Sequence, residues 1–200
     1  MENIIENITR IVFGLICHQD SSFLLTVDGR EVLLCPRCIG LQFGFLSSYF
    51  FLRRWLRGRT MVIEMPAYVM IVISLGALAL DWASGQLGFW IPSSISRLIT
   101  GLAGGIAFSI FTCAYRSQMY NSPGVRLHKF TAINFVLIFS FSLLVAFALV
   151  KLSGWTLLSS ALLFTVTINA IIIVHKIFIV ILSRLSRREE TQILKKGALS

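Results

Sequence analysis

The chain has 200 residues, of which 56% are hydrophobic and only 14% are charged. A soluble domain is about half apolar and about a quarter charged, so this composition argues against a soluble protein and indicates a polytopic membrane protein. The net charge of +9 does not by itself indicate nucleic-acid binding, because basic residues in membrane proteins usually report orientation.

Residues 3–16 carry apolar side chains at close to helical spacing, interrupted by Glu6 and Arg10. This segment is shorter than the ~20 apolar residues that a membrane-spanning helix needs. We therefore predict an amphipathic helix that lies on, or packs against, the membrane domain and ends at Cys17. The first ten residues lack a basic region ahead of an apolar one, so no cleavable signal peptide is expected.

Residues 23–34 have the pattern of a β-hairpin. Two short runs of β-forming residues flank Asp28-Gly29, a favoured two-residue turn. Because a hairpin brings its two ends together, Cys17 and His18 are predicted to lie near Cys35 and Cys38 despite their separation in sequence.

Five apolar runs follow and predict membrane-spanning helices over residues 39–52, 65–83, 95–115, 130–150 and 156–182. The third contains Gly101, Gly104 and Gly105, small residues that let neighbouring helices approach closely. The predicted fold is an all-α integral membrane bundle of about five transmembrane helices with an N-terminal amphipathic helix and a short Cys/His β-hairpin module. We expect one domain, with residues 1–38 forming the interfacial helix and hairpin, 39–182 the bundle, and 183–200 a polar tail with a short surface helix.

The distribution of basic residues predicts the orientation. The segments that follow the first, third and fifth runs, together with Lys176 near the end of the fifth run, hold 13 of the 18 lysines and arginines. Basic residues favour the cytoplasmic side, so the C-terminus is expected in the cytoplasm and the cysteine segment on the outer face of the plasma (inner) membrane.

Cys17, His18, Cys35 and Cys38 form a possible tetrahedral Cys3His ligand set. Zinc takes thiolate and imidazole ligands, and Cys-x-x-Cys is a common half-site. Only Cys35 and Cys38 have that spacing, and the adjacent side chains of Cys17 and His18 cannot easily both reach one ion. A zinc site is the first interpretation. Cys113 is a lone cysteine within an apolar run and is expected to pack in the interior.

Two other interpretations of the cysteines remain open. Cys35-Pro36-Arg37-Cys38 opens a helix, where the helix dipole and Arg37 would favour a thiolate at Cys38, as in a thiol–disulfide oxidoreductase. No thioredoxin-like βαβ pattern surrounds this motif. The cysteines could instead form a structural disulfide or pack in the core.

The same topology places Asp81, Gln86 and Arg97 on the outer face with the cysteines. An ionisable side chain at membrane depth is a functional candidate by default. Asp81 is a candidate general base or metal ligand, and Arg97 a candidate clamp for a lipid phosphate. The alternative is that Asp81 and Arg97 form an interfacial ion pair that closes a helix–helix contact.

Cys17-His18-Gln19, Cys35-x-Arg37-Cys38-x-Gly40, Asp81, Gln86, Arg97 and Thr100-Gly101 together resemble a family of predicted prokaryotic membrane proteins, domain of unknown function two thousand and eighty-five. The resemblance covers roughly residues 14–110. It implies that the Cys-His-Gln and Cys-x-Arg-Cys residues, with Asp81 and Arg97, belong to one shared site, and it supplies no reaction.

The sequence therefore predicts a membrane protein with a zinc site at the outer interface and an enzymatic action on a lipid or lipid-linked substrate. Asp81, Arg97 and Gln86 are its candidate catalytic residues. A membrane thiol–disulfide oxidoreductase that uses Cys35 and Cys38 is the alternative, as is a non-enzymatic protein with a structural zinc cap. The expected partners are the lipid bilayer and the lipid substrate, and no nucleic acid.

Overall fold

The structure is a computed structural model that describes residues 2–15, 17, 24–56, 60–88, 93–119, 127–152 and 154–197. It divides into two compact units, Met1–Thr165 and Val166–Ser200. The second unit holds only the C-terminal part of the last helix, and the first holds all the other elements. The predicted boundaries at residues 38 and 182 stay a prediction.

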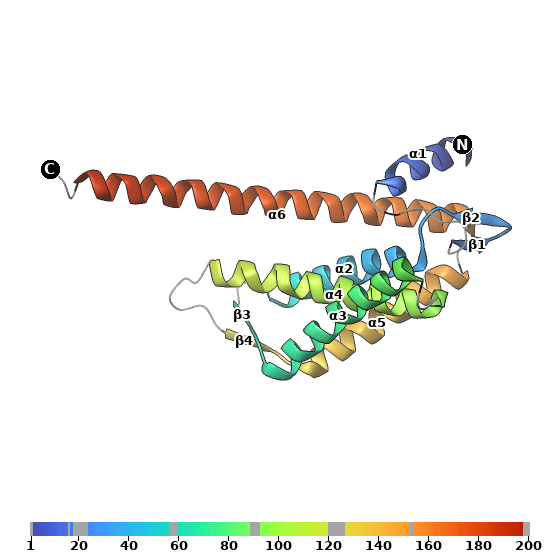
Figure 1. Cartoon of the computed structure of the whole chain (residues 1–200), viewed down its shortest axis with the longest axis horizontal. Coiled ribbons are helices and arrows are strands. Elements are labelled where there is room, and N and C mark those ends of the chain that lie inside the picture. Colours follow the sequence, from blue (N-terminus) through green and yellow to red (C-terminus); the bar gives the residue numbers. More distant parts are fainter. Residues whose placement is uncertain are drawn as a thin grey trace. The chain divides into compact units, whose positions relative to one another are not determined.

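The described part of the chain is predominantly helical, which confirms the predicted fold class (Figure 1). The helices are α1 (Glu2–Gly14), α2 (Pro36–Trp55), α3 (Met65–Leu87), α4 (Ser94–Met119), α5 (Ala132–Leu152) and α6 (Trp155–Gly197). The strands are β1 (Leu25–Val27), β2 (Arg30–Val32), β3 (Thr60–Ile63) and β4 (Leu127–Phe130), and they form two small sheets.

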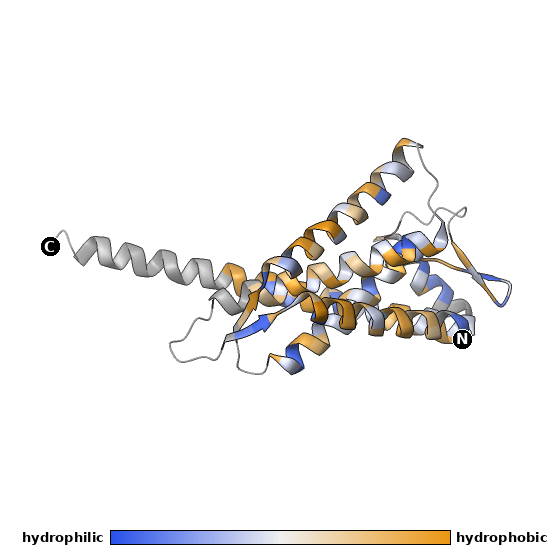
Figure 2. Cartoon of the chain, turned by 90° about the horizontal axis from the view of Figure 1, so that it is seen from below, coloured by the Kyte–Doolittle hydropathy of each residue, from blue (hydrophilic) through white to orange (hydrophobic). Residues whose placement is uncertain are grey.

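By length and composition, four helices of the described part can cross a membrane, over Met65–Gly85, Ser94–Ala114, Ala132–Leu149 and Trp155–Ile181. Figure 2 shows that hydrophobic residues dominate these helices. The first predicted span forms as α2, a helix of 20 residues, but it is not apolar enough to be among the four. Nine of its residues are buried, so α2 is surrounded largely by protein and does not need a fully apolar surface.

Glycines bring α2 and α4 into close contact. A Cβ atom at Gly40 or Gly44 of α2 would overlap the backbone of α4, and one at Gly101 or Gly105 of α4 would overlap the backbone of α2. The predicted role of Gly101 and Gly105 is therefore confirmed. Hydrogen bonds between serine hydroxyls then join α2 to α4 through Ser48 and Ser109, and α2 to α5 through Ser47 and Ser142.

The helix ends follow ordinary rules of backbone chemistry. Pro36 and Pro66 stand at the starts of α2 and α3, where the missing N–H would have no partner within the helix. Gly88 has a φ of 70° and ends α3 in the left-handed conformation that glycine adopts without strain. These boundaries bring Asp81 within two turns of the end of α3.

Two features differ from the prediction. The loops after α2 and α4 contain β3 and β4, which pair in parallel from Thr60↔Leu127 to Ile63↔Phe130. Such short strands are marginal alone and form because a distant segment supplies the partner. In addition, α6 continues to Gly197, so the predicted separate surface helix after residue 183 is part of α6. Both parts are helical, and no Pro or Gly interrupts the chain between them.

Candidate metal centre

The predicted hairpin is present and leads into the first turn of α2. β1 and β2 pair antiparallel with Leu25 opposite Val32 and Val27 opposite Arg30. Asp28 and Gly29 connect them with φ angles of 51° and 73°. Positive φ at both central residues is the geometry for which the Asp-Gly pair is favoured in tight hairpins.

Trp155 at the start of α6 holds the hairpin in place. Its backbone N–H donates to Asp28 Oδ2 at 2.9 Å, so the hairpin turn caps the N-terminus of α6. Its indole Nε1–H donates to the carbonyl oxygen of Glu31 at 3.0 Å. The guanidinium of Arg30 lies 5.3 Å from the centre of the Trp155 ring, a cation–π distance. These contacts fix the segment that carries the cysteines.

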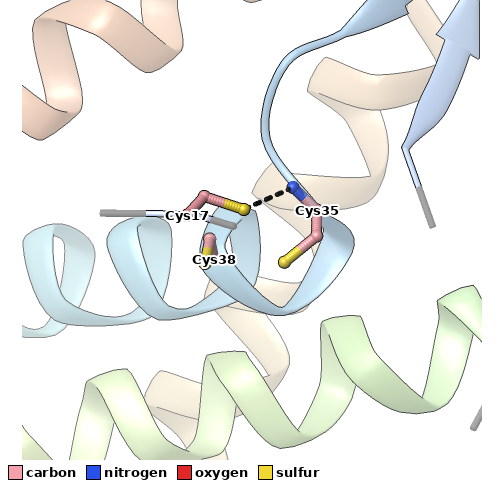
Figure 3. A group of neighbouring side chains, drawn as sticks. All are labelled: Cys17, Cys35 and Cys38. Carbon is pink, nitrogen blue, oxygen red and sulfur yellow. Dashed lines mark hydrogen bonds between the residues drawn. The ribbon is translucent and has the colours of Figure 1, made fainter. Parts of the chain in front are cut away.

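Three cysteines meet at the end of this segment (Figure 3). Cys17 follows α1, and its backbone N–H donates to the carbonyl oxygen of Phe13 at 2.8 Å. Cys35 is the residue preceding α2, and Cys38 lies in its first turn. The Sγ atoms of Cys17, Cys35 and Cys38 all lie within 4.8 Å of one another, which confirms the predicted closure of the hairpin for these three residues. His18, the fourth predicted ligand, lies outside the described residues.

The geometry of the three thiols suits a metal ion. In a tetrahedral zinc site with Zn–S distances of ~2.3 Å, the sulfur atoms stand about 3.8 Å apart. The observed spacing is at most about 1 Å wider, which small rotations of the side chains can close. The backbone N–H of Cys35 donates to Cys17 Sγ at 3.4 Å, a hydrogen bond of the kind that orients thiolate ligands.

The proximity of the thiols also controls their protonation. The hydrogen bond with Cys17 is the largest cause that raises the pKa of both Cys35 and Cys38, and burial raises each pKa further. Neighbouring thiolates would repel one another in this buried place, which disfavours the deprotonated forms of Cys35 and Cys38. Redox-active cysteines need the opposite shift. The predicted stabilisation of a Cys38 thiolate by Arg37 is wrong, because Arg37 reaches a different partner.

That partner is Asp81 of α3. Arg37 Nε donates to Asp81 Oδ2 in a very short hydrogen bond, and Arg37 Nη2 donates to the backbone oxygen of Asp81 at 3.0 Å. The side chains of Arg37 and Asp81 are only 15% and 6% exposed. Asp81 thus forms its ion pair with Arg37, where the alternative prediction had named Arg97. The glycine contacts place the start of α2 against α4, from where the long Arg37 side chain reaches α3.

Arg97 lies near the turn of α3 that follows Asp81, where its side chain approaches Gly85. It is buried in the first turns of α4, and its Nη2 atom lies 3.5 Å from the position that a Cβ at Gly85 would take. Gln86 is the next residue of α3, and its side chain lies outside the described part. The structure thus brings Asp81 and Arg97 to the same helix ends as the thiols, while their catalytic role stays a prediction.

Arg37 is the residue whose contact the sequence analysis missed. Its position between two cysteines suggested an effect on the thiols, and nothing in the spacing showed that its side chain turns to α3. Trp155 was also missed, although a tryptophan with a buried N–H usually needs a hydrogen-bond acceptor, which was an available signal.

The chain was compared with protein families, curated proteins and solved structures. No curated protein and no solved structure matches it. Residues 17–111, which run from the first thiol through most of α4, match the model of the family described as predicted membrane protein, DUF2085. The resemblance predicted from the Cys-His-Gln and Cys-x-Arg-Cys motifs is confirmed: just under half of the chain is similar to this family of predicted membrane proteins, and the three clustered cysteines within that part could hold a metal ion.

Proposed function

We propose that this protein binds a zinc ion through Cys17, Cys35 and Cys38 at the outer interface of the membrane. The observation that supports this most is the approach of three Sγ atoms to within 4.8 Å, from segments that are 18 residues apart in sequence. Thiolate ligands favour zinc among the common divalent ions. Three protein ligands leave the fourth position for His18, a water molecule or a substrate atom.

We further propose that the site acts on a lipid or lipid-linked substrate. Asp81, Arg97 and Gln86 lie in the same helix ends as the thiols, at the end of one apolar helix and the start of the next. In this proposal Asp81 acts as a base, and Arg97 and Gln86 bind polar groups of the substrate. A bound zinc ion would supply Lewis-acid chemistry if its fourth position stays open.

A thiol–disulfide oxidoreductase is the second candidate, because Cys35 and Cys38 open a helix with two residues between them. One observation favours the metal, because a third thiol shares the cluster. A structural zinc cap uses the same ligands and differs in lacking a substrate.

The metal content of protein purified in detergent tests this proposal. The wild type is expected to carry zinc at close to one ion per chain, and Cys35→Ser is expected to lose it because two thiols bind zinc weakly. Cys113→Ser is the matched control, since Cys113 is a buried thiol of α4 and is not among the clustered three. A wild type without metal, with a thiol count that rises on reduction, would favour the oxidoreductase.

We also propose that the C-terminus faces the cytoplasm and the thiol cluster faces the outside of the plasma membrane. The excess of basic residues at and after the C-terminal ends of α2 and α4, and in the C-terminal half of α6, supports this orientation. A membrane-impermeant thiol reagent, applied to intact cells after zinc chelation, is expected to label the wild type. It should label Cys17→Ser/Cys35→Ser/Cys38→Ser only after lysis, if at all. Labelling of the wild type only after lysis would reverse the orientation.

A further inference from the structure

Gly85 is a position without a side chain on α3 that two arginines border. It lies one turn after Asp81 and is exposed, at the last residue of the apolar span Met65–Gly85. The position that a Cβ at Gly85 would take lies 3.5 Å from Arg97 Nη2 and 3.9 Å from Arg37 Nη2. A group that approaches α3 beside Gly85 therefore meets guanidinium groups from two other helices.

Arg37 has hydrogen-bonding capacity to spare at this place. A guanidinium carries five N–H donors. Two of those on Arg37 are used by the carboxylate and the backbone oxygen of Asp81. Asp81 thus holds the Arg37 side chain in a fixed position, and the other N–H groups of Arg37 make no hydrogen bond within the part of the chain that the structure describes. A fixed guanidinium loses little entropy when it binds an oxyanion.

The position and the geometry of the two guanidinium groups indicate which class of ligand they would bind. Two guanidinium groups that converge from different helices suit an anion with more than two oxygen atoms, because a single guanidinium already satisfies a carboxylate. Gly85 lies where one apolar span ends, and the next span, Ser94–Ala114, begins a few residues later. Lipid phosphates lie at this level, at the boundary of the hydrocarbon layer.

We propose that Arg37 and Arg97 bind a phosphate group over Gly85. This inference deepens the proposed function by assigning its lipid or lipid-linked substrate a phosphate that Arg37 and Arg97 hold, next to Asp81.

The test places a carboxylate where the phosphate would bind. Gly85→Asp adds an anion within reach of both arginines, and Gly85→Asn adds a side chain of the same size without charge. The protein is reconstituted in phosphatidylcholine nanodiscs. Its thermal unfolding is followed while phosphatidic acid in the disc, or inorganic phosphate in the buffer, is titrated. The reference is the same protein without either ligand, in a chloride buffer of equal ionic strength that contains no sulfate.

The wild type is expected to unfold at a higher temperature with added phosphatidic acid or phosphate, and Gly85→Asp to bind the ligand about tenfold more weakly than Gly85→Asn. A response to phosphatidic acid alone identifies a lipid headgroup, and a response to phosphate identifies a soluble source. No response of the wild type to either, or equal binding by the two variants, would overturn the proposal. If Gly85→Asp does not fold, the wild-type titration decides.

Zinc content, measured on the same samples, separates this inference from the metal proposal. Gly85→Asp is expected to keep its zinc while it loses the response to phosphate. A wild type that responds to phosphate without containing zinc would contradict the metal site and leave the phosphate site standing.

Discussion

At the scale of single residues, Arg37 connects the two halves of the site. It stands between Cys35 and Cys38, and it makes two hydrogen bonds with Asp81 of α3. Both side chains of the pair are largely buried. A buried ion pair stabilises a fold little compared with apolar residues, but the loss of one partner leaves a charge without compensation. The pair therefore fixes the relative positions of α2 and α3 near the thiols.

Replacing one member of this pair is expected to be costly. Asp81→Leu should lower the free energy of unfolding by about 3–5 kcal/mol, because the Arg37 charge stays buried without its partner. Arg37→Met/Asp81→Leu should recover most of that loss. Thermal or denaturant unfolding in detergent measures both variants. If the double variant lost as much free energy of unfolding as Asp81→Leu and Arg37→Met lose in sum, the pair would not be coupled.

The sequence predicted the thiol cluster and not the arginine contact, for a physical reason. The Asp28-Gly29 turn and the Cys-x-x-Cys spacing are local patterns, and they sufficed to bring Cys17 to Cys35 and Cys38. The partner of Asp81 depends on how α2, α3 and α4 are rotated about their axes. That rotation follows from side-chain packing between helices, which no local pattern specifies.

At the scale of the elements, the contact between α2 and α4 positions the site. Gly101 of α4 lies against the carbonyl group of Arg37, and Gly40 of α2 lies against that of Leu98. The first turn of α2, which carries Cys38 and Arg37, is thereby held directly on α4. This close contact explains why α2 can be less apolar than the four candidate spans.

Gly101→Ala is expected to destabilise the protein by at least about 1–3 kcal/mol, because its methyl group would push the two backbones apart. It should also reduce zinc content, since the start of α2 would move. Gly76→Ala is the matched control. A Cβ at Gly76 of α3 meets nothing within 4 Å, so this substitution should be neutral or slightly stabilising. Equal unfolding temperatures of the two variants would contradict the proposed contact.

The helices were predictable because their apolar runs are long, and the β3–β4 pair was not. Each of these strands has four residues, and their parallel pairing joins segments on either side of α3 and α4. The end of α6 differs from the prediction because the change from apolar to charged residues does not mark the end of the helix. A helix can continue through such a change, since backbone hydrogen bonds do not depend on side-chain polarity.

At the scale of the whole molecule, the first compact unit gathers its polar chemistry at one set of helix ends. The hairpin is tied to the start of α6 by Trp155. The thiols lie at the start of α2, Asp81 towards the end of α3 and Arg97 at the start of α4. The family match over residues 17–111 covers all of these except Trp155. A metal ion at the thiols would therefore lie at the same helix ends as the two arginines and Asp81.

X-ray absorption at the zinc edge of the purified protein tests the central claim most directly. The account predicts three sulfur ligands at about 2.3 Å and one nitrogen or oxygen ligand at about 2.0–2.1 Å. A nitrogen from His18 would close the site, and an exchangeable oxygen would leave it open for a substrate. Zinc coordinated only by nitrogen and oxygen atoms, or a protein that binds no metal, would contradict the claim.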